Sequence, residues 1–108
     1  MKRVLPLRIP VYIKAELISG SKKYPAIIGN FSEKGAFVET GPTKSATLFL
    51  PGKKIKLRFT DSPKNSMDLN CEVIWLYTKK LVRNSVTNSL GLEIKKPSSK
   101  YSKYFQDL

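Results

Sequence analysis

The longest alternation of apolar and polar residues in this chain is Met67-Asp68-Leu69-Asn70-Cys71-Glu72-Val73-Ile74-Trp75-Leu76-Tyr77. Successive side chains of a β-strand point to opposite faces, so a period of two predicts a strand with one buried face. We expect such a strand here, with Trp75 packed in the core and Cys71 a buried, unreactive thiol. The inward face is predicted to carry Met67, Leu69, Cys71, Val73, Trp75 and Tyr77.

The same period recurs on both sides of this stretch. Several short strands with no convincing long helix predict an all-β fold, either an antiparallel barrel or a two-sheet sandwich. The other predicted strands cover residues 9–17, 24–31, 36–40, 54–60 and 90–94. Residues 48–50 are expected to form either a further strand or a cap on the barrel, and residues 79–89 a polar hairpin connection.

A length of 108 residues predicts a single domain with one hydrophobic core. We divide the chain into a flexible basic segment at residues 1–8, a barrel at 9–96 and a tail at 97–108 that is helical or irregular. In a helical tail, the aromatic residues would share one side because they lie three or four positions apart, and we expect that side to pack on the barrel. These residues are Tyr101, Tyr104 and Phe105.

The composition limits the classes of function. Twenty Lys and Arg against eight Asp and Glu leave a net charge of +12, which attracts nucleic acids, nucleotides or acidic surfaces. The absence of histidine removes the commonest general base and metal ligand, so we expect no enzyme, no metal site and no cofactor. The single cysteine allows no intrachain disulfide, and there is no signal peptide and no membrane-spanning run. We therefore expect a soluble, cytoplasmic protein.

Two clusters of residues suggest a binding site. The segment Asn30-Phe31-Ser32-Glu33-Lys34-Gly35 lies at a turn between two predicted strands, where these residue types are also consistent with an ordinary turn. The first eight residues hold Lys2, Arg3 and Arg8 and no acid. A guanidinium can form two hydrogen bonds to phosphate oxygens or to the O6/N7 edge of guanine. The competing interpretation of the second cluster is a solvated basic terminus.

Together, the two clusters resemble the PilZ family of cyclic di-GMP receptors, which carry Arg-x-x-x-Arg before the first strand and Asp/Asn-x-Ser-x-x-Gly after it. Asn30, Ser32 and Gly35 fill the second motif, and Arg8 stands where the second arginine of the family stands. The resemblance implies a small antiparallel β-barrel of six to seven strands. It extends from Arg3 to Ile94 and includes Gly35-Ala36-Phe37-Val38, Gly52, Val73-Ile74-Trp75 and Leu90-Gly91-Leu92-Glu93-Ile94.

One position departs from the family pattern. The residue four before Arg8 is Val4, and the nearest arginine is Arg3, five before. In a loop, a shift of one residue moves a side chain by about 3.5 Å at most, which a long arginine can span. We therefore expect Arg3 to substitute for the missing arginine.

The resemblance assigns a role to each motif residue. Arg8 and Arg3 would grip guanine and phosphate, Asn30 and Ser32 would hydrogen-bond a guanine or the sugar-phosphate, and Gly35 would let the backbone close under the ligand. Cyclic di-GMP would then fold the N-terminal segment over the barrel and alter the surface presented to an effector protein. The effector could belong to the motility, pilus, polysaccharide or transcription machinery.

Two other functions remain open. The broken arginine spacing is consistent with a PilZ-like module that ignores the nucleotide and acts through protein contacts alone. A basic barrel of this size could also bind single-stranded nucleic acid, although that use normally needs exposed aromatic residues, and most aromatics here are predicted to face inward.

A basic stripe on one predicted strand comprises Lys54, Lys56 and Arg58, and Lys53 continues it nearby. Such a stripe is either a face that binds polyanions or a solvated strand face whose charges prevent aggregation. We interpret it here as a solvated face.

Overall fold

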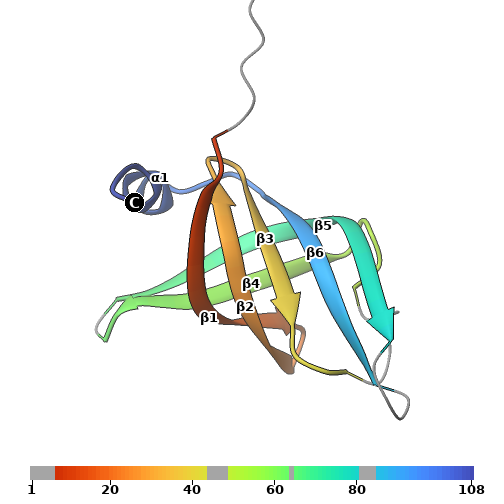
Figure 1. The fold of residues 1–108 in the computed structure, drawn as a ribbon. Coiled ribbons are helices and arrows are strands. Elements are labelled where there is room, and N and C mark those ends of the chain that lie inside the picture. Colours follow the sequence, from red (N-terminus) through yellow and green to blue (C-terminus); the bar gives the residue numbers. More distant parts are fainter. Residues whose placement is uncertain (1–6, 44–48, 64, 81–84) are drawn as a thin grey trace, which may run out of the picture.

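The computed structural model describes residues 7–43, 49–63, 65–80 and 85–108. Six antiparallel strands close into one barrel in the order β1-β2-β3-β6-β5-β4, and a short helix follows the last strand (Figure 1). This confirms the all-β prediction and selects the barrel over the sandwich. The elements are β1 Ile9–Ser19, β2 Lys22–Ser32, β3 Gly35–Thr40, β4 Lys54–Ser62, β5 Asn65–Lys80, β6 Val86–Ile94 and α1 Ser99–Gln106.

The core fills the barrel as the period of two predicts. In β4, for example, Ile55, Leu57 and Phe59 are buried, while the lysines and the arginine between them stay on the outer face. Phe49 is also fully buried, and its ring meets the Tyr24 ring edge-on at 5.3 Å between centroids. Residue 49 is outside any strand, so of the two predictions for residues 48–50 the structure favours the cap, with residue 48 outside the described residues.

The predicted inward face of β5 is correct only as far as Val73. The register between β5 and β6 shifts at this point, because Val73 is opposite Leu92 and Trp75 is opposite Gly91. Ile74 is therefore the extra residue of a β-bulge, and an extra residue exchanges the two faces of all that follows. The prediction that Trp75 and Tyr77 face the core is wrong: these side chains are 43% and 64% exposed.

The predicted polar connection at residues 79–89 is also largely wrong. β5 continues to Lys80 and β6 begins at Val86, with residues 81–84 outside the described part of the chain. Polar residues can occupy a strand here because Asn88, fully buried, bonds to neighbouring threonines. Its amide nitrogen donates to the hydroxyls of Thr40 and Thr43, and its amide oxygen accepts from Thr78.

Helix α1 lies at one end of the barrel (Figure 1). Ser98 caps its N-terminus by accepting a hydrogen bond from the Tyr101 backbone at 3.1 Å. Tyr101 is completely buried, and burial raises the pKa of its phenol, which therefore stays neutral and able to donate. The Phe31 ring contacts both Tyr101 and Tyr104, so the aromatic side of the helix packs on the barrel as predicted.

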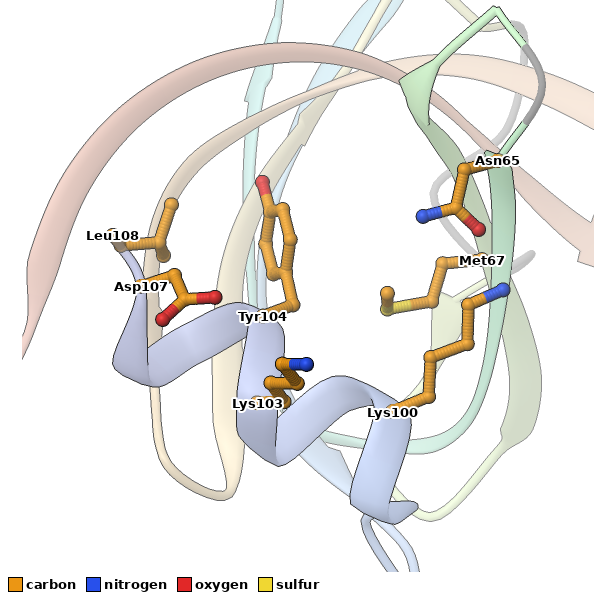
Figure 2. A pocket seen from close by; sticks show the side chains of 7 residues that line it. All are labelled: Asn65, Met67, Lys100, Lys103, Tyr104, Asp107 and Leu108. Carbon is orange, nitrogen blue, oxygen red and sulfur yellow. The ribbon is translucent and has the colours of Figure 1, made fainter.

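A cavity of about 420 Å³ separates part of α1 from the start of β5. Figure 2 shows the Lys100 side chain extending from the helix toward Asn65 and Met67 on β5, while the Tyr104 ring stands up from the helix on the other side of the cavity. The Lys100 ammonium donates to the carbonyl oxygen of Ser66 at 3.1 Å. The helix is thus held to the barrel by a polar contact beside the cavity as well as by its buried aromatic rings.

Within the described ranges, no helix is long and apolar enough to cross a membrane.

A candidate ligand groove beside Arg8 and Asn30

The predicted motif Asn30 to Gly35 forms the tight connection from β2 to β3. Asn30 and Ser32 lie two positions apart at the end of β2. Gly35 is the first residue of β3 and lies directly opposite Ser32. The Lys34 carbonyl accepts a hydrogen bond from the Ile94 backbone at 2.7 Å, which ties the turn to the end of β6. The turn is therefore fixed to a third strand.

The structure brings three of the predicted site residues to one groove. The Arg8 guanidinium donates through Nη1 to Oδ1 of Asn30 at 3.2 Å, although the two residues lie far apart in the sequence. Both line a groove of about 460 Å³, together with Gly35. The remaining lining residues are Ala36, Phe37, Ile74, Trp75, Gly91 and Leu92.

Ser32 lies at the turn directly opposite Gly35, and its hydroxyl would be 3.1 Å from a Cβ atom on that glycine. Its predicted contact with a ligand stays a prediction. Ser32 is only 7% exposed and is not among the groove residues that the structure describes. Its backbone carbonyl accepts a hydrogen bond of 2.6 Å from the Tyr101 hydroxyl of α1. Ser32 thus connects the turn to the helix, one residue away from the buried ring of Phe31. Arg3, the other predicted site residue, lies outside the described residues.

Glycine is needed at position 35 because a side chain would not fit there, and not because the backbone has a conformation that only glycine favours. Among the described glycines, only Gly20 and Gly52 have a positive φ. A Cβ atom on Gly35 would lie 2.9 Å from the backbone oxygen of Leu92 and 3.1 Å from the hydroxyl of Ser32. The backbone oxygen belongs to a paired strand and cannot easily move, so this position admits no side chain without displacing the turn.

We expect Gly35→Ala to lower the free energy of unfolding by about 1–3 kcal/mol, the usual cost of overpacking. Urea denaturation of the purified variant measures this change. The matched control is Gly41→Ala, where the nearest atom, the Pro25 carbonyl oxygen, lies 3.9 Å from the added Cβ. If the two variants are equally stable, the close approach at Gly35 has no energetic importance.

Two aromatic rings of the groove were missed by the sequence prediction. The Trp75 indole lies directly over Gly91, and the Phe37 ring lies over Gly29, where a Cβ would be 2.9 Å from a ring carbon. The two ring centroids are 5.8 Å apart, with their planes inclined by 30°. We call Phe37 and Trp75 the aromatic surface of the groove. The uninterrupted apolar run Val73–Tyr77 was the available signal, because it is compatible with either face of a strand.

Most aromatic residues were predicted to face inward, and most of those that the structure describes are buried or half-buried. Three of the described aromatic side chains are nevertheless exposed by 43–78%. Tyr12 was predicted to face outward, whereas the other two were not. They are Tyr12, Trp75 and Tyr77.

Other chemistry is sparse among the described residues. No group of three or more histidine, cysteine, aspartate or glutamate side chains could hold a metal ion in that part of the chain. Burial raises the pKa of the Cys71 thiol to about 12, as expected for an unreactive thiol. The Arg58 guanidinium holds the pKa of Asp68 below its usual value through a hydrogen-bonded ion pair at 2.8 Å. This carboxylate is therefore ionised and paired near neutral pH.

Comparison with known proteins identifies the family. A profile of the PilZ domain matches residues 2–107. The fold is similar to the PilZ domain of YcgR from Escherichia coli, solved with c-di-GMP, with a TM-score of 0.73 at 12% identity, covering 97% of this chain and 87% of that one. It is also similar to the inhibitor of motility MotI/DgrA of Bacillus subtilis, with a TM-score of 0.70 at 12% identity, covering 99% of this chain and 49% of that one. No curated protein matches the sequence. Since the profile spans nearly the whole chain, the protein belongs to the PilZ domain family.

Proposed function

We propose that this PilZ protein is a cytoplasmic receptor for cyclic di-GMP that signals to an effector protein and is not an enzyme. The observation that carries the proposal is the Arg8–Asn30 hydrogen bond of 3.2 Å at the edge of the groove. It supports a role for the two motif residues in a single site. The groove volume of about 460 Å³ lies within the range of roughly 300–1,000 Å³ typical of small-molecule sites. The PilZ domain of YcgR, solved with c-di-GMP, supports the same choice of ligand.

The chemistry of the groove suits a guanine nucleotide. Arg8 supplies a planar cation that can grip a phosphate or the O6/N7 edge of guanine with two hydrogen bonds. Asn30 can supply its amide N–H donors to the same edge, where O6 and N7 both accept, while its amide oxygen accepts from Arg8. Trp75 and Phe37 add ring faces on which a base can stack, an interaction worth about 1–3 kcal/mol per base. Charge and stacking therefore converge on a ligand that is both anionic and aromatic.

Ligand binding would be transmitted through the segment that carries Arg8. Ordering that segment over the barrel costs on the order of 1–2 kcal/mol per residue fixed, so several charge-assisted hydrogen bonds are needed to offset it. Arg3 is proposed to supply some of these bonds. The ordered segment would change the surface that the effector meets.

The proposal is tested by isothermal titration of the purified protein with cyclic di-GMP. We expect saturable binding, with cyclic di-AMP bound more weakly because adenine lacks the O6 acceptor that a guanidinium reads. The same titration gives the number of nucleotides bound. An absence of binding would instead favour the module that acts through protein contacts alone, the interpretation that Val4 supports.

We expect Trp75→Ala to weaken cyclic di-GMP binding by about 1–3 kcal/mol, the value typical of one base stacked on an aromatic ring. The change is measured by the same titration. Tyr77→Ala is the matched control, because Tyr77 is an exposed aromatic of the same strand that does not line the groove. Equal losses in the two variants would show that the aromatic surface makes no specific contact with the base.

A further inference from the structure

A second groove, of about 630 Å³, lies on the outer face of the barrel where β1, β4 and β5 meet. It shares no lining residue with the groove beside Arg8. Four lysines line it, against a single acid, Glu72. The lysines are Lys54 and Lys56 of β4 and Lys95 and Lys96, which follow β6. We call this the lysine groove.

The charges in the lysine groove are only partly neutralised by the protein itself. The Lys95 ammonium lies 2.7 Å from the Glu93 carboxylate and 3.5 Å from that of Glu72, so one lysine forms ion pairs with two carboxylates. The nearby Asp68 carboxylate forms an ion pair with Arg58. Within the described part of the chain, no ion pair is formed by the other three lysines of the groove, Lys54, Lys56 and Lys96. Three positive charges thus line a concave surface without forming ion pairs, although the Asp68 carboxylate, paired with Arg58, interacts with Lys56 at longer range.

The spacing of two of these lysines matches an extended peptide. Lys54 and Lys56 stand on the outer face of β4 on either side of the buried Ile55. Alternate residues of a strand are about 6.6–6.8 Å apart, and an extended peptide presents every second side chain at the same interval. A segment with acidic residues at alternate positions can therefore place one carboxylate at each lysine.

The lining residues favour an acidic peptide over nucleic acid. Recognition of a single strand normally combines cationic residues with aromatic rings on which the bases stack. The lysine groove contains no aromatic side chain and no arginine among its described lining residues. Its apolar contribution comes mainly from the half-buried Ile18, because Ile55 is only 5% exposed. This apolar surface suits aliphatic or threonine side chains between the acids.

We propose that the lysine groove binds an extended, acidic segment of a partner protein, with Lys54 and Lys56 contacting acidic side chains two residues apart. This surface is separate from the nucleotide groove and does not depend on nucleotide binding. It also revises our interpretation of the basic stripe on β4 as a merely solvated face. Of the described residues in that stripe, only Arg58 forms an ion pair, a partly exposed one with Asp68, as expected for a solvated face.

The test uses fluorescence anisotropy of a short labelled peptide of alternating glutamate and threonine, without nucleotide. We expect the parent protein to bind this peptide and not the matched glutamine–threonine peptide. The double variant Lys54→Gln/Lys56→Gln should bind about 2- to 30-fold more weakly, from about 0.2–1 kcal/mol for each exposed ion pair. Its cyclic di-GMP titration should equal that of the parent.

The matched control is Lys79→Gln/Lys80→Gln, which removes the same charge from exposed lysines of β5 outside the groove. This variant should bind the acidic peptide as the parent does. An equal loss in the control, or no peptide binding by the parent, would overturn the proposal. So would tighter binding of single-stranded oligouridylate that depends on the same two lysines. None of these outcomes bears on the nucleotide groove, so the two proposals fail independently.

Discussion

Replacing Tyr101 with alanine is expected to lower the free energy of unfolding by about 3–5 kcal/mol, the usual cost of deleting a buried aromatic side chain. Tyr101 is completely buried, and its ring lies 5.5 Å from that of Phe31. The substitution also removes the Tyr101 hydroxyl, which donates to the Ser32 carbonyl oxygen at 2.6 Å. Chemical denaturation followed by tryptophan fluorescence measures the change, because Trp75 is the single tryptophan.

Two further variants show whether this loss comes from burial. Tyr12→Ala removes the same side chain from a position that is 78% exposed, and should change stability by less than about 0.5 kcal/mol. Tyr101→Phe keeps the ring and removes the hydroxyl, so it should cost about 1–3 kcal/mol, the penalty of an unsatisfied buried acceptor. Equal stability of Tyr101→Ala and Tyr12→Ala would mean that α1 contributes nothing to the fold.

Replacing Arg8 with alanine is expected to weaken cyclic di-GMP binding by about 1.5–3 kcal/mol, the scale of a hydrogen bond to a charged group. Arg8 lies at the edge of the groove with Nη1 3.2 Å from Oδ1 of Asn30. The substitution removes both the positive charge of Arg8 and its planar guanidinium, which can form two parallel hydrogen bonds. Titration calorimetry of parent and variant gives the difference directly.

The two contributions of Arg8 can be separated. Arg8→Lys keeps the charge but cannot form two parallel hydrogen bonds, so its affinity should lie between those of the parent and Arg8→Ala. Arg58→Ala is the control for net charge, because Arg58 is an exposed arginine that does not line the nucleotide groove. It should bind the nucleotide as the parent does. Identical affinities for Arg8→Ala and the parent would remove Arg8 from the site.

Local sequence was sufficient to predict most strands and the turn that carries the motif. The period of two appears directly in segments such as β4, since each side chain there faces either the core or water. The turn residues between Asn30 and Gly35 act over a few bonds, so their effect is also visible in the sequence. The family motif then suggested that Arg8 and Asn30 meet, as they do at 3.2 Å.

The tertiary structure alone decided which side chains line the groove and how the turn is held to the rest of the barrel. The bulge at Ile74 reverses the faces of β5 and exposes Trp75, since the shift depends on pairing with Gly91 and not on local composition. Ser32 is held by Tyr101 across the barrel end, a contact between residues far apart in the chain. Register and long-range hydrogen bonds form only when distant segments pair. A local pattern of apolar and polar residues therefore cannot encode them.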